Sequence, residues 1–267
     1  MEKIGLIAGN RKFPLLFAEC AKKKGCSIVA VAIKGETSAQ LRHLADKIYW
    51  LDLKDFNRLF DIFKFEGVTK VVMAGQISPR RLFSRIMTVS PVLRELLDSL
   101  KDKRANTIFT AIADKLNEAE LEVLDSTTYL EDFIPVKGVL TSKKPTTEEW
   151  EDIQFGMDLA KKVAELDIGQ TVAVKNKAII GVEAFEGTDN LIRRAGRLAR
   201  GGITVAKVSR PQQDMRFDIP VIGLNTVKNL CRVKARCLAI EAGKTLFLDR
   251  PASIALADSK GISIVAV

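Results

Sequence analysis

The sequence KIGLIAGN, residues 3–10, decides the fold of the N-terminal half. Its run of mostly apolar residues over 3–8, which Gly9 and Asn10 interrupt, is typical of a buried β-strand followed by a tight turn. Apolar residues then recur at helical spacing over 13–24, and a second apolar run over 27–33 predicts another strand. A strand, a helix and a strand in this order favour parallel pairing with a right-handed crossover.

The same alternation continues through the first half of the chain. It predicts a Rossmann-like parallel sheet covered by helices, so the fold class is α/β. The further elements predicted there are strands over 47–53, 68–74 and 122–124, and helices over 55–65, 79–103 and 106–117.

The composition changes near residues 134–147, where two prolines accompany Gly, Ser and Lys residues. Such a stretch is typical of a linker. We therefore predict an N-terminal Rossmann-like domain over 1–134, a linker over 135–147 and a C-terminal catalytic domain over 148–267.

The second half begins with a capping box, in which Thr146 and Glu149 start a helix that extends to about Leu166. Asn176 and Lys177 join two strands as a hairpin turn, so the sheet of this α/β domain is predicted to be mixed. The predicted elements are strands over 171–175, 178–183, 203–208, 238–241 and 262–267, and helices over 190–200 and 225–236.

The composition of the chain excludes several classes of protein and of site. The chain has 267 residues, 47% hydrophobic and 28% charged, which excludes a disordered chain. A formal charge of +9 favours anionic partners such as phosphates, nucleotides, nucleic acid or an acidic lipid surface. His43 is the only histidine, which excludes a multi-histidine metal site, and excludes a Ser-His-Asp triad that lacks His43.

The cysteines and the apolar runs of the sequence indicate no metal site and no membrane span. The cysteines at 20, 26, 231 and 237 are spaced more widely than zinc ligands, and we expect reduced packing thiols. No apolar run approaches 18 residues and the N-terminus does not resemble a signal peptide, so we expect a cytoplasmic protein with no membrane span.

Gly5 and Gly9 flank the first predicted turn, between a strand and a helix. Backbone N–H groups at such a helix N-terminus favour an anion. The three-glycine dinucleotide fingerprint is incomplete, although Glu36 ends the second strand where a ribose-binding carboxylate is expected. The turn is thus open to three interpretations: a phosphate contact, a nicotinamide or flavin site, or a plain tight turn.

The segment EAFEGTD, residues 183–189, places three acids and a hydroxyl before a predicted helix. Thr188 or Asp189 would suit the helix cap. Capping does not account for Glu183 and Glu186, which would either lie in solvent or face a metal ion.

The densest signal is KVSRPQQDMRFDIPVIG, residues 207–223. Asp214 and Asp218 lie four residues apart in a loop that two prolines stiffen, after a strand. Carboxylate oxygens suit Mg²⁺ or Mn²⁺, and arginine forks suit phosphate. The alternative is a salt-bridged loop, for instance Arg216 with Asp218.

Taken together, these segments resemble the UDP-2,3-diacylglucosamine pyrophosphatase family of the LpxI type. The residues that carry the resemblance, in order along nearly the whole chain, are GLIAG at 5–9 with FP at 13–14, FG at 155–156, LDIGQ at 166–170, EGTD at 186–189, RAG at 194–196, the strand over 204–208, the loop over 211–223, AIEAGKT at 239–245 and LDR at 248–250. The resemblance implies a two-domain, Mg²⁺-dependent and commonly dimeric enzyme of lipid A synthesis, which binds its substrate between the domains.

On this basis we predict that Asp214 and Asp218 are catalytic. They would also hold Mg²⁺, or Mn²⁺, together with Glu186 and Asp189. The predicted substrate-binding residues are Gly9, Asn10, Gly75, Gln76, Thr188, Lys207, Gln213, Arg216, Glu241 and Gly243. Leu82, Phe83, Ile86 and Met87 are candidates for the entrance of an acyl-chain channel.

The expected partners are the nucleotide–lipid substrate, a second copy of the chain in a homodimer, and weakly an anionic membrane surface. We expect no nucleic-acid partner, because the basic and aromatic residues are scattered. The alternative function is a nucleotide-cofactor-dependent oxidoreductase that uses the N-terminal glycine turn. A scaffolding protein is a further alternative if the acidic loop is only a knot of salt bridges.

Overall fold

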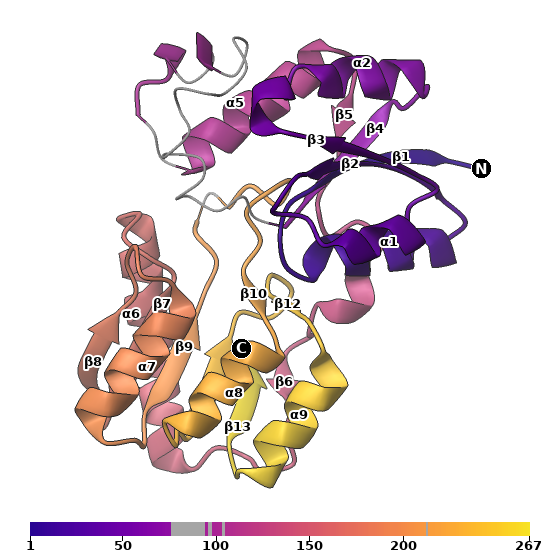
Figure 1. Cartoon of the computed structure of the whole chain (residues 1–267). Coiled ribbons are helices and arrows are strands. Elements are labelled where there is room, and N and C mark those ends of the chain that lie inside the picture. Colours follow the sequence, from indigo (N-terminus) through magenta and orange to yellow (C-terminus); the bar gives the residue numbers. More distant parts are fainter. Residues whose placement is uncertain (76–93, 96–97, 103–104, 212) are drawn as a thin grey trace. The chain divides into compact units, whose positions relative to one another are not determined.

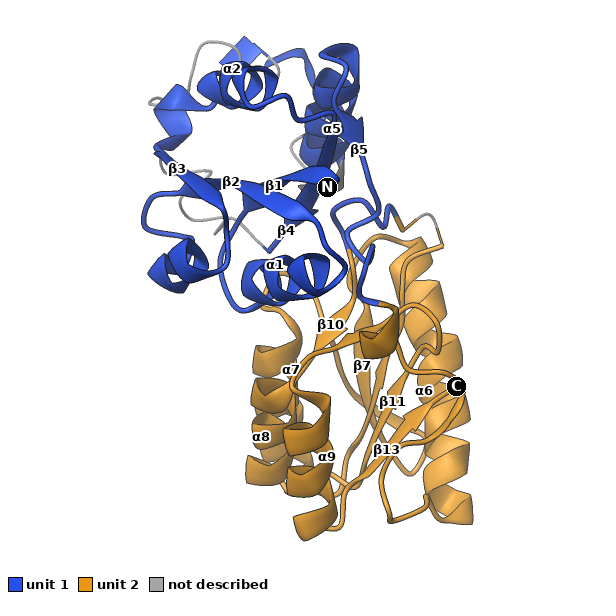
Figure 2. Cartoon of the chain, turned by 90° about the vertical axis from the view of Figure 1, so that its right-hand side faces the viewer, with its two compact units in different colours: residues 1–130, 214–218 blue, residues 131–213, 219–267 orange. Residues whose placement is uncertain are grey.

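The structure is a computed structural model that describes residues 1–75, 94–95, 98–102, 105–211 and 213–267 (Figure 1). The chain forms two compact units (Figure 2). The first unit contains residues 1–130 and 214–218, and the second contains residues 131–213 and 219–267. The predicted residue Gln76, the four acyl-channel candidates and most of the predicted helix 79–103 lie outside the described residues.

The first unit is built on a five-stranded parallel sheet with the strand order β3-β2-β1-β4-β5. This order and direction confirm the Rossmann-like prediction. Its elements are β1 (Lys3–Ala8), α1 (Phe13–Lys23), β2 (Ser27–Ile33), η1 (Ala39–His43), β3 (Lys47–Leu51), η2 (Leu53–Asp55), α2 (Arg58–Phe65), β4 (Lys70–Ala74), α5 (Ala105–Glu118) and β5 (Glu122–Val123).

Helices cover both faces of this sheet, α1 on one face and α2 and α5 on the other (Figure 1). The strands β1 and β2 are buried along nearly their whole length, which explains their apolar sequence without alternation. Helix α1 packs Phe17 and Ala18 into the core, and Gly25, with φ of +82°, ends the turn that follows it. Helix α2 begins at Arg58 instead of Asp55, because the preceding residues form the 3₁₀ turn η2.

The second unit contains a six-stranded mixed sheet with the strand order β6-β13-β11-β9-β7-β8, which confirms the predicted mixed α/β fold. Its elements are η4 (Glu131–Phe133), β6 (Gly138–Val139), α6 (Thr147–Glu165), β7 (Thr171–Lys175), β8 (Ala178–Val182), α7 (Thr188–Ala199), β9 (Thr204–Lys207), β10 (Val221–Ile222), α8 (Leu224–Arg232), β11 (Cys237–Ile240), β12 (Leu246–Phe247), α9 (Arg250–Ser259) and β13 (Ser263–Ala266).

Helix α6 covers one face of this sheet, and α7, α8 and α9 cover the other (Figure 2). Helix α9 and the small parallel pair of β10 with β12 are additions to the predicted elements. Helix α8 ends at Arg232, four residues before the predicted end, since Lys234 has a left-handed φ of +52°.

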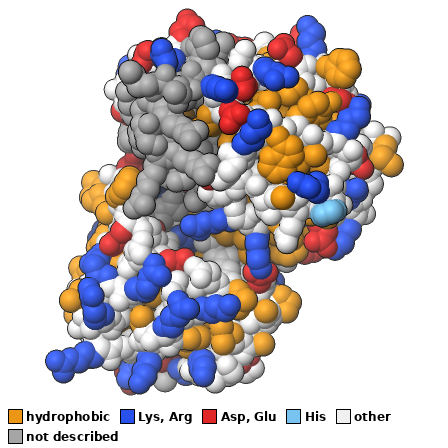
Figure 3. Space-filling model, in the orientation of Figure 1, with side chains coloured by type: hydrophobic (Ala, Val, Ile, Leu, Met, Phe, Trp, Pro, Cys, Tyr) orange, Lys and Arg blue, Asp and Glu red, His pale blue; other side chains and the backbone are white. Residues whose placement is uncertain are grey.

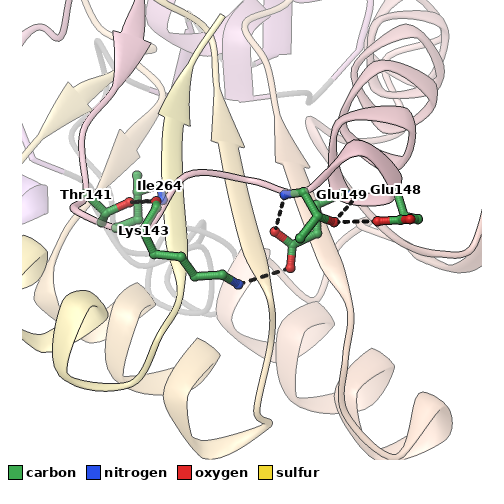
Figure 4. Close-up of polar contacts among 6 residues, drawn as sticks. Thr141, Lys143, Glu148, Glu149 and Ile264 are labelled. Carbon is green, nitrogen blue, oxygen red and sulfur yellow. Dashed lines mark hydrogen bonds and ion pairs between the residues drawn. The ribbon is translucent and has the colours of Figure 1, made fainter.

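The start of α6 is fixed by the predicted capping box, which the structure confirms (Figure 4). The Glu149 amide donates to Thr146 Oγ1 at 3.2 Å, and the Thr146 amide donates to Glu149 Oε2 at 3.1 Å. Lys143 pairs with the other oxygen of Glu149 at 3.1 Å. Just upstream, Thr141 Oγ1 accepts the Ile264 amide of β13 at 2.9 Å. The stretch before α6 is therefore tied to the second sheet, in which residues 138–139 form β6.

Residues 214–218 belong to the first unit although they come late in the sequence. The Ser126 amide donates to Met215 O at 2.9 Å, and the Ser126 hydroxyl lies 2.5 Å from Arg216 O and 2.6 Å from Met73 O of β4. Phe217 stacks on Phe109 of α5 with ring centroids 5.7 Å apart. The segment is thus held near the carboxyl end of β4.

Candidate functional site

At the carboxyl edge of the first sheet, the glycine turn after β1 meets the end of β4. The Gly9 amide donates to Ala74 O at 2.8 Å. A Cβ on Gly75 would lie 2.5 Å from Asn10 O, and Gly75 has a φ of +85°, so only glycine fits there. The predicted residues Gly9, Asn10 and Gly75 are therefore brought together.

Asn10 links this turn to the acid that ends β2. Its Nδ2 donates to Glu36 Oε2 at 2.8 Å, while Asn10 Oδ1 is buried and has no partner in the described part of the chain. A buried amide oxygen without a partner suits a donor on a ligand. The position predicted for a ribose-binding carboxylate is thus occupied by an acid that already accepts one hydrogen bond.

Asp214 and Arg216 form a tight ion pair in the segment held by the first unit. Arg216 Nη2 lies 2.7 Å from Asp214 Oδ2 and Arg216 Nε lies 3.0 Å from Oδ1. The hydrogen bonds from Arg216 lower the pKa of the Asp214 carboxyl, against the opposing effect of burial. The salt-bridged loop considered above is present, but its acid is Asp214, whereas the Asp218 amide donates to Asp214 O at 2.9 Å.

The carboxyl ends of β8 and β9 meet the start of β7 at one edge of the second sheet. Lys207 ends β9 directly opposite Thr171, and its side chain is buried. Lys207 Nζ donates to Thr188 Oγ1 at 2.8 Å, and Thr188 Oγ1 donates to Glu183 Oε1 at 2.9 Å. A lysine, a hydroxyl at the start of α7 and a carboxylate thus form one connected chain.

Glu183 was predicted either to lie in solvent or to face a metal ion, and it was not among the predicted site residues, yet it joins this chain. It is only 9% exposed, and its second oxygen, Oε2, is buried without a partner among the described residues. Its backbone is fixed closely, because a Cβ on Gly169 would lie 2.0 Å from Glu183 O. The sequence marked this acid by its position directly after a strand, but it did not show that the side chain is buried or that it contacts Thr188.

Glu241 forms the next polar cluster along this edge, after β11. One of its oxygens, Oε2, accepts Ser209 N at 2.8 Å, Ser209 Oγ at 2.7 Å and Lys161 Nζ at 2.6 Å. Burial alone would raise the pKa of Glu241, but these hydrogen bonds and one from Lys244 hold it at about 2. Glu241 is therefore ionised, and its carboxylate is held by Ser209, Lys161 and Lys244. Ser209 and Lys161 are further residues that the sequence did not predict.

Two more predicted substrate residues flank these clusters. Gln213 Oε1 accepts the Arg210 amide at 2.7 Å, which shapes the loop after β9. Gly243 has a φ of +70°, and its amide donates to Pro135 O at 2.9 Å. These contacts give both residues a structural role. Their contacts with the substrate stay predictions.

The two acids before and within α7 have separate partners. Glu186 forms an ion pair with Arg194 at 2.5 Å, and Asp189 Oδ2 accepts from Asn225 Nδ2 at 2.5 Å. Asp189 Oδ1 is buried without a partner in the described part of the chain. The prediction that Thr188 or Asp189 caps α7 is wrong: the N-cap is Gly187, whose φ of +80° lets the chain turn so that both residues lie inside the helix.

The predicted metal ligands fall into two pairs. Asp214 and Asp218 belong to the first unit, and Glu186 and Asp189 belong to the second. Within the described ranges, no group of three or more His, Cys, Asp or Glu side chains is arranged to hold a metal ion. Mg²⁺ commonly takes only one or two carboxylates together with substrate phosphates and water, so the oxygen chemistry of Asp214 and Asp218 fits it.

The four cysteines are thiols that form no disulfide bond in the described residues, and burial raises the pKa of the Cys237 thiol to about 12. This agrees with the expectation of packing thiols. No helix among the described residues is both long and apolar enough to cross a bilayer.

The fold and its two polar sheet edges define a two-domain α/β protein with a Rossmann-like first domain. Two family models match it, the LpxI N-terminal domain over residues 3–133 and the LpxI C-terminal domain over residues 136–265. The chain therefore belongs to the LpxI family, as the resemblance predicted.

One relative and two solved structures complete the comparison. The chain is 29% identical over 279 aligned positions to the UDP-2,3-diacylglucosamine pyrophosphatase LpxI of Caulobacter vibrioides, covering 100% of this chain and 98% of that protein. Biotin carboxylase of Campylobacter jejuni is 11% identical, covering 74% of this chain and 42% of that one, with a TM-score of 0.29. N5-carboxyaminoimidazole ribonucleotide synthetase of Thermotoga maritima is 18% identical, covering 68% and 42%, with a TM-score of 0.25. Because both TM-scores are far below 0.5, neither structure bears on the site.

Proposed function

We propose that this protein hydrolyses UDP-2,3-diacylglucosamine to UMP and 2,3-diacylglucosamine 1-phosphate in lipid A biosynthesis. The observation that carries the proposal is the match to a pyrophosphatase of this name along the whole chain, with the segment that contains Asp214 and Asp218 included. The buried Lys207, beside the start of α7, supports a phosphorylated substrate, since helix N-termini and lysines favour anions.

In the proposed reaction, water attacks the phosphorus on the sugar side of the pyrophosphate. The bond from that phosphorus to the bridging oxygen breaks, and the oxygen leaves with UMP. Because Arg216 contacts both oxygens of Asp214, we assign to Asp218 the role of taking the proton from the attacking water. Asp214 and Arg216 then act as an oriented pair at the phosphates.

The anionic pyrophosphate repels an incoming nucleophile, and the protein must offset this charge. Lys207 and Arg216 are proposed to bind phosphate oxygens, with Thr188 fixing the lysine. Mg²⁺ bound by Asp214 and Asp218 would neutralise further charge on the phosphates. Mn²⁺, which prefers similar oxygen ligands, would serve in its place.

Phosphorus NMR of UDP-2,3-diacylglucosamine with the protein and Mg²⁺ tests this function. We expect UMP and the sugar 1-phosphate to appear together, and the reaction to stop when a chelator is added. In ¹⁸O-labelled water the label should enter the sugar 1-phosphate. Co-purified flavin or nicotinamide with no hydrolysis would instead favour the oxidoreductase.

The catalytic assignment is tested by Asp214→Ala and Asp218→Ala. We expect kcat to fall by about two orders of magnitude or more in each variant while the circular dichroism spectrum is unchanged. Exposed Asp61→Ala is a matched control that should keep full activity. Near-normal turnover in both site variants would remove these aspartates from the mechanism.

We further propose that the protein is a cytoplasmic homodimer that binds weakly to the anionic inner surface of the membrane. The substrate of the proposed reaction carries two acyl chains, which supports an encounter at a lipid surface. The homodimer rests on the resemblance to the family. Sedimentation velocity tests it, and a monomer at working concentration would contradict it.

A further inference from the structure

One exposed face of the second unit combines arginines with bare apolar side chains. Between Asn190 and Arg200, the sequence of α7 and its cap contains four arginines and no acid. Arg193, Arg197 and Arg200 are exposed. Figure 3 shows the face of the second unit that carries α7 and α8, where Lys and Arg side chains outnumber the acids.

A surface pocket of ≈ 350 Å³ lies along this part of α7. It is lined by Glu186, Asn190, Arg193, Arg194 and Arg197. Glu186 neutralises Arg194 through their ion pair, and Arg193 Nη2 donates to Asn190 Oδ1 at 2.6 Å. The pocket is therefore positively charged on balance, and Arg193 and Arg194 are held by these contacts.

Apolar side chains flank the arginines. Phe185, directly before the pocket residue Glu186, is 92% exposed, and Leu198 of α7 is 62% exposed. Phe185 and Leu198 therefore leave apolar surface uncovered close in sequence to the arginines, which is the combination that a membrane interface favours. The opposite side of α7 is fully used by the core, where Gly196 allows close contact with Val233 of the α8 cap.

We propose that Phe185, Leu198 and the arginines at 193, 197 and 200 form the surface by which this protein docks on an anionic lipid bilayer. Helices that lie at a membrane interface place aromatic and aliphatic side chains among the acyl chains and basic side chains at the headgroups. The charge of the pocket is complementary to anionic headgroups. The choice of a bilayer over other polyanions rests on the proposed function, whose substrate is a lipid.

This surface contributes to the encounter of the protein with its substrate, which precedes the chemical step. A membrane-bound population raises the local concentration of an acylated substrate without any change in the reacting groups. The docking residues are separate from the residues proposed for catalysis, so the two roles can be tested separately.

The test is co-sedimentation of the full chain with vesicles of phosphatidylcholine, alone or mixed with phosphatidylglycerol, at low and high salt. We expect binding only to the anionic vesicles, and weaker binding in high salt. The double variant Arg193→Gln/Arg197→Gln should bind roughly tenfold more weakly or worse. Phe185→Ser should bind several-fold more weakly at both salt concentrations, because it removes an apolar contact.

Matched controls come from the first unit. Arg42→Gln/Arg58→Gln removes the same charge from exposed positions, and Phe65→Ser removes a phenylalanine that is 84% exposed. Both controls should bind vesicles like the wild type. The assignment would be overturned if the Arg193→Gln/Arg197→Gln and Phe185→Ser variants bound vesicles like the wild type, or if the controls lost as much binding. A protein that binds heparin but not vesicles would overturn it as well.

Hydrolysis of the substrate in detergent micelles separates this proposal from the proposed function. The Arg193→Gln/Arg197→Gln and Phe185→Ser variants should hydrolyse micellar substrate at the wild-type rate. They should lose activity only when the substrate is in anionic vesicles. Vesicle binding by a protein that hydrolyses nothing would contradict the proposed function and support the docking surface. Full hydrolysis of vesicle substrate by the Arg193→Gln/Arg197→Gln variant would overturn the surface alone.

Discussion

At the scale of single residues, the charge state of Asp214 depends on Arg216. The Arg216 guanidinium lowers the pKa of the Asp214 carboxyl, and burial opposes this effect. In Arg216→Gln, burial acts without the guanidinium, so the pKa of Asp214 should rise. The acidic limb of the kcat/KM profile should then move to higher pH.

Arg210→Gln is the control for this experiment. Arg210 belongs to the same loop and pairs with Asp167 at 2.9 Å. Its removal should leave the acidic limb in place. Identical acidic limbs in the wild type and Arg216→Gln would show that the ionisation of Asp214 does not limit the reaction.

Glu241 makes a prediction about stability. Its folded-state pKa of about 2 lies below its ordinary value of 4.5, so its contribution is present above about pH 4.5 and is lost as the pH falls toward 2. The expected loss between neutral pH and about pH 3 is about 2 kcal/mol. Urea unfolding at both pH values should show this loss in the wild type and a smaller one in Glu241→Gln.

The exposed carboxylate Glu131 supplies the comparison for that measurement. Glu131→Gln should keep the pH dependence of the wild type, since the contribution belongs to the Lys161–Ser209–Glu241 cluster. Equal pH dependence in all three proteins would place the acid sensitivity elsewhere.

At the scale of elements, Gly169 positions the turn after β8. An added Cβ would lie 2.0 Å from Glu183 O, so Gly169→Ala must displace that backbone and the Glu183–Thr188–Lys207 chain with it. We expect a loss of about 2 kcal/mol in stability and a fall of about tenfold or more in kcat/KM. Urea unfolding and steady-state kinetics measure the two effects.

Gly196→Ala separates a local effect on the site from general destabilisation. Its Cβ would lie 2.2 Å from Val233 Cβ, at the contact of α7 with the end of α8. This variant should lose similar stability and keep its kcat/KM under conditions where it is folded. If both variants lose activity in proportion to stability, Gly169 has no special role at the site.

The elements also show what local sequence can predict. Buried apolar runs such as β1 and β2 were placed to the residue, because a strand covered on both faces must be apolar throughout. Helix α7 was predicted to start at Asn190 and starts at Thr188, since the N-cap is a glycine and lacks a capping side chain. Strands of two residues, such as β10 and β12, are too short to show any periodicity.

The candidate site was predicted only in part for a related reason. Residue types marked Lys207 and Thr188, but the contact between these two side chains spans 19 residues. The carboxylate that Thr188 contacts was identifiable from its place after a strand, whereas the contact of Glu241 with Lys161 spans 80 residues. No local pattern encodes such a pairing, which depends on how the strands are ordered in the sheet.

At the scale of the whole molecule, the chain order and the compact units differ in one place. Residues 214–218 belong to the first unit, where Phe217 stacks on Phe109 and packs against the core formed with α5. A side chain from the second half of the sequence therefore stabilises the N-terminal fold. Phe217→Ala should lower the stability of the first unit by about 1–2 kcal/mol, because the ring is only partly buried.

The two tryptophans allow each unit to be followed separately, since Trp50 lies in β3 and Trp150 in α6. In a Trp150→Phe background, Phe217→Ala should lower the urea midpoint that Trp50 reports. In a Trp50→Phe background, the midpoint that Trp150 reports should stay unchanged. Equal shifts at both tryptophans would mean that the units unfold as a single cooperative body, and no shift at Trp50 would mean that the 214–218 segment contributes nothing to the first unit. The same segment carries Asp214 and Asp218, and its contacts with Ser126 and Phe109 fix the positions of these carboxylates. Either result would therefore also show how firmly the proposed catalytic residues are held.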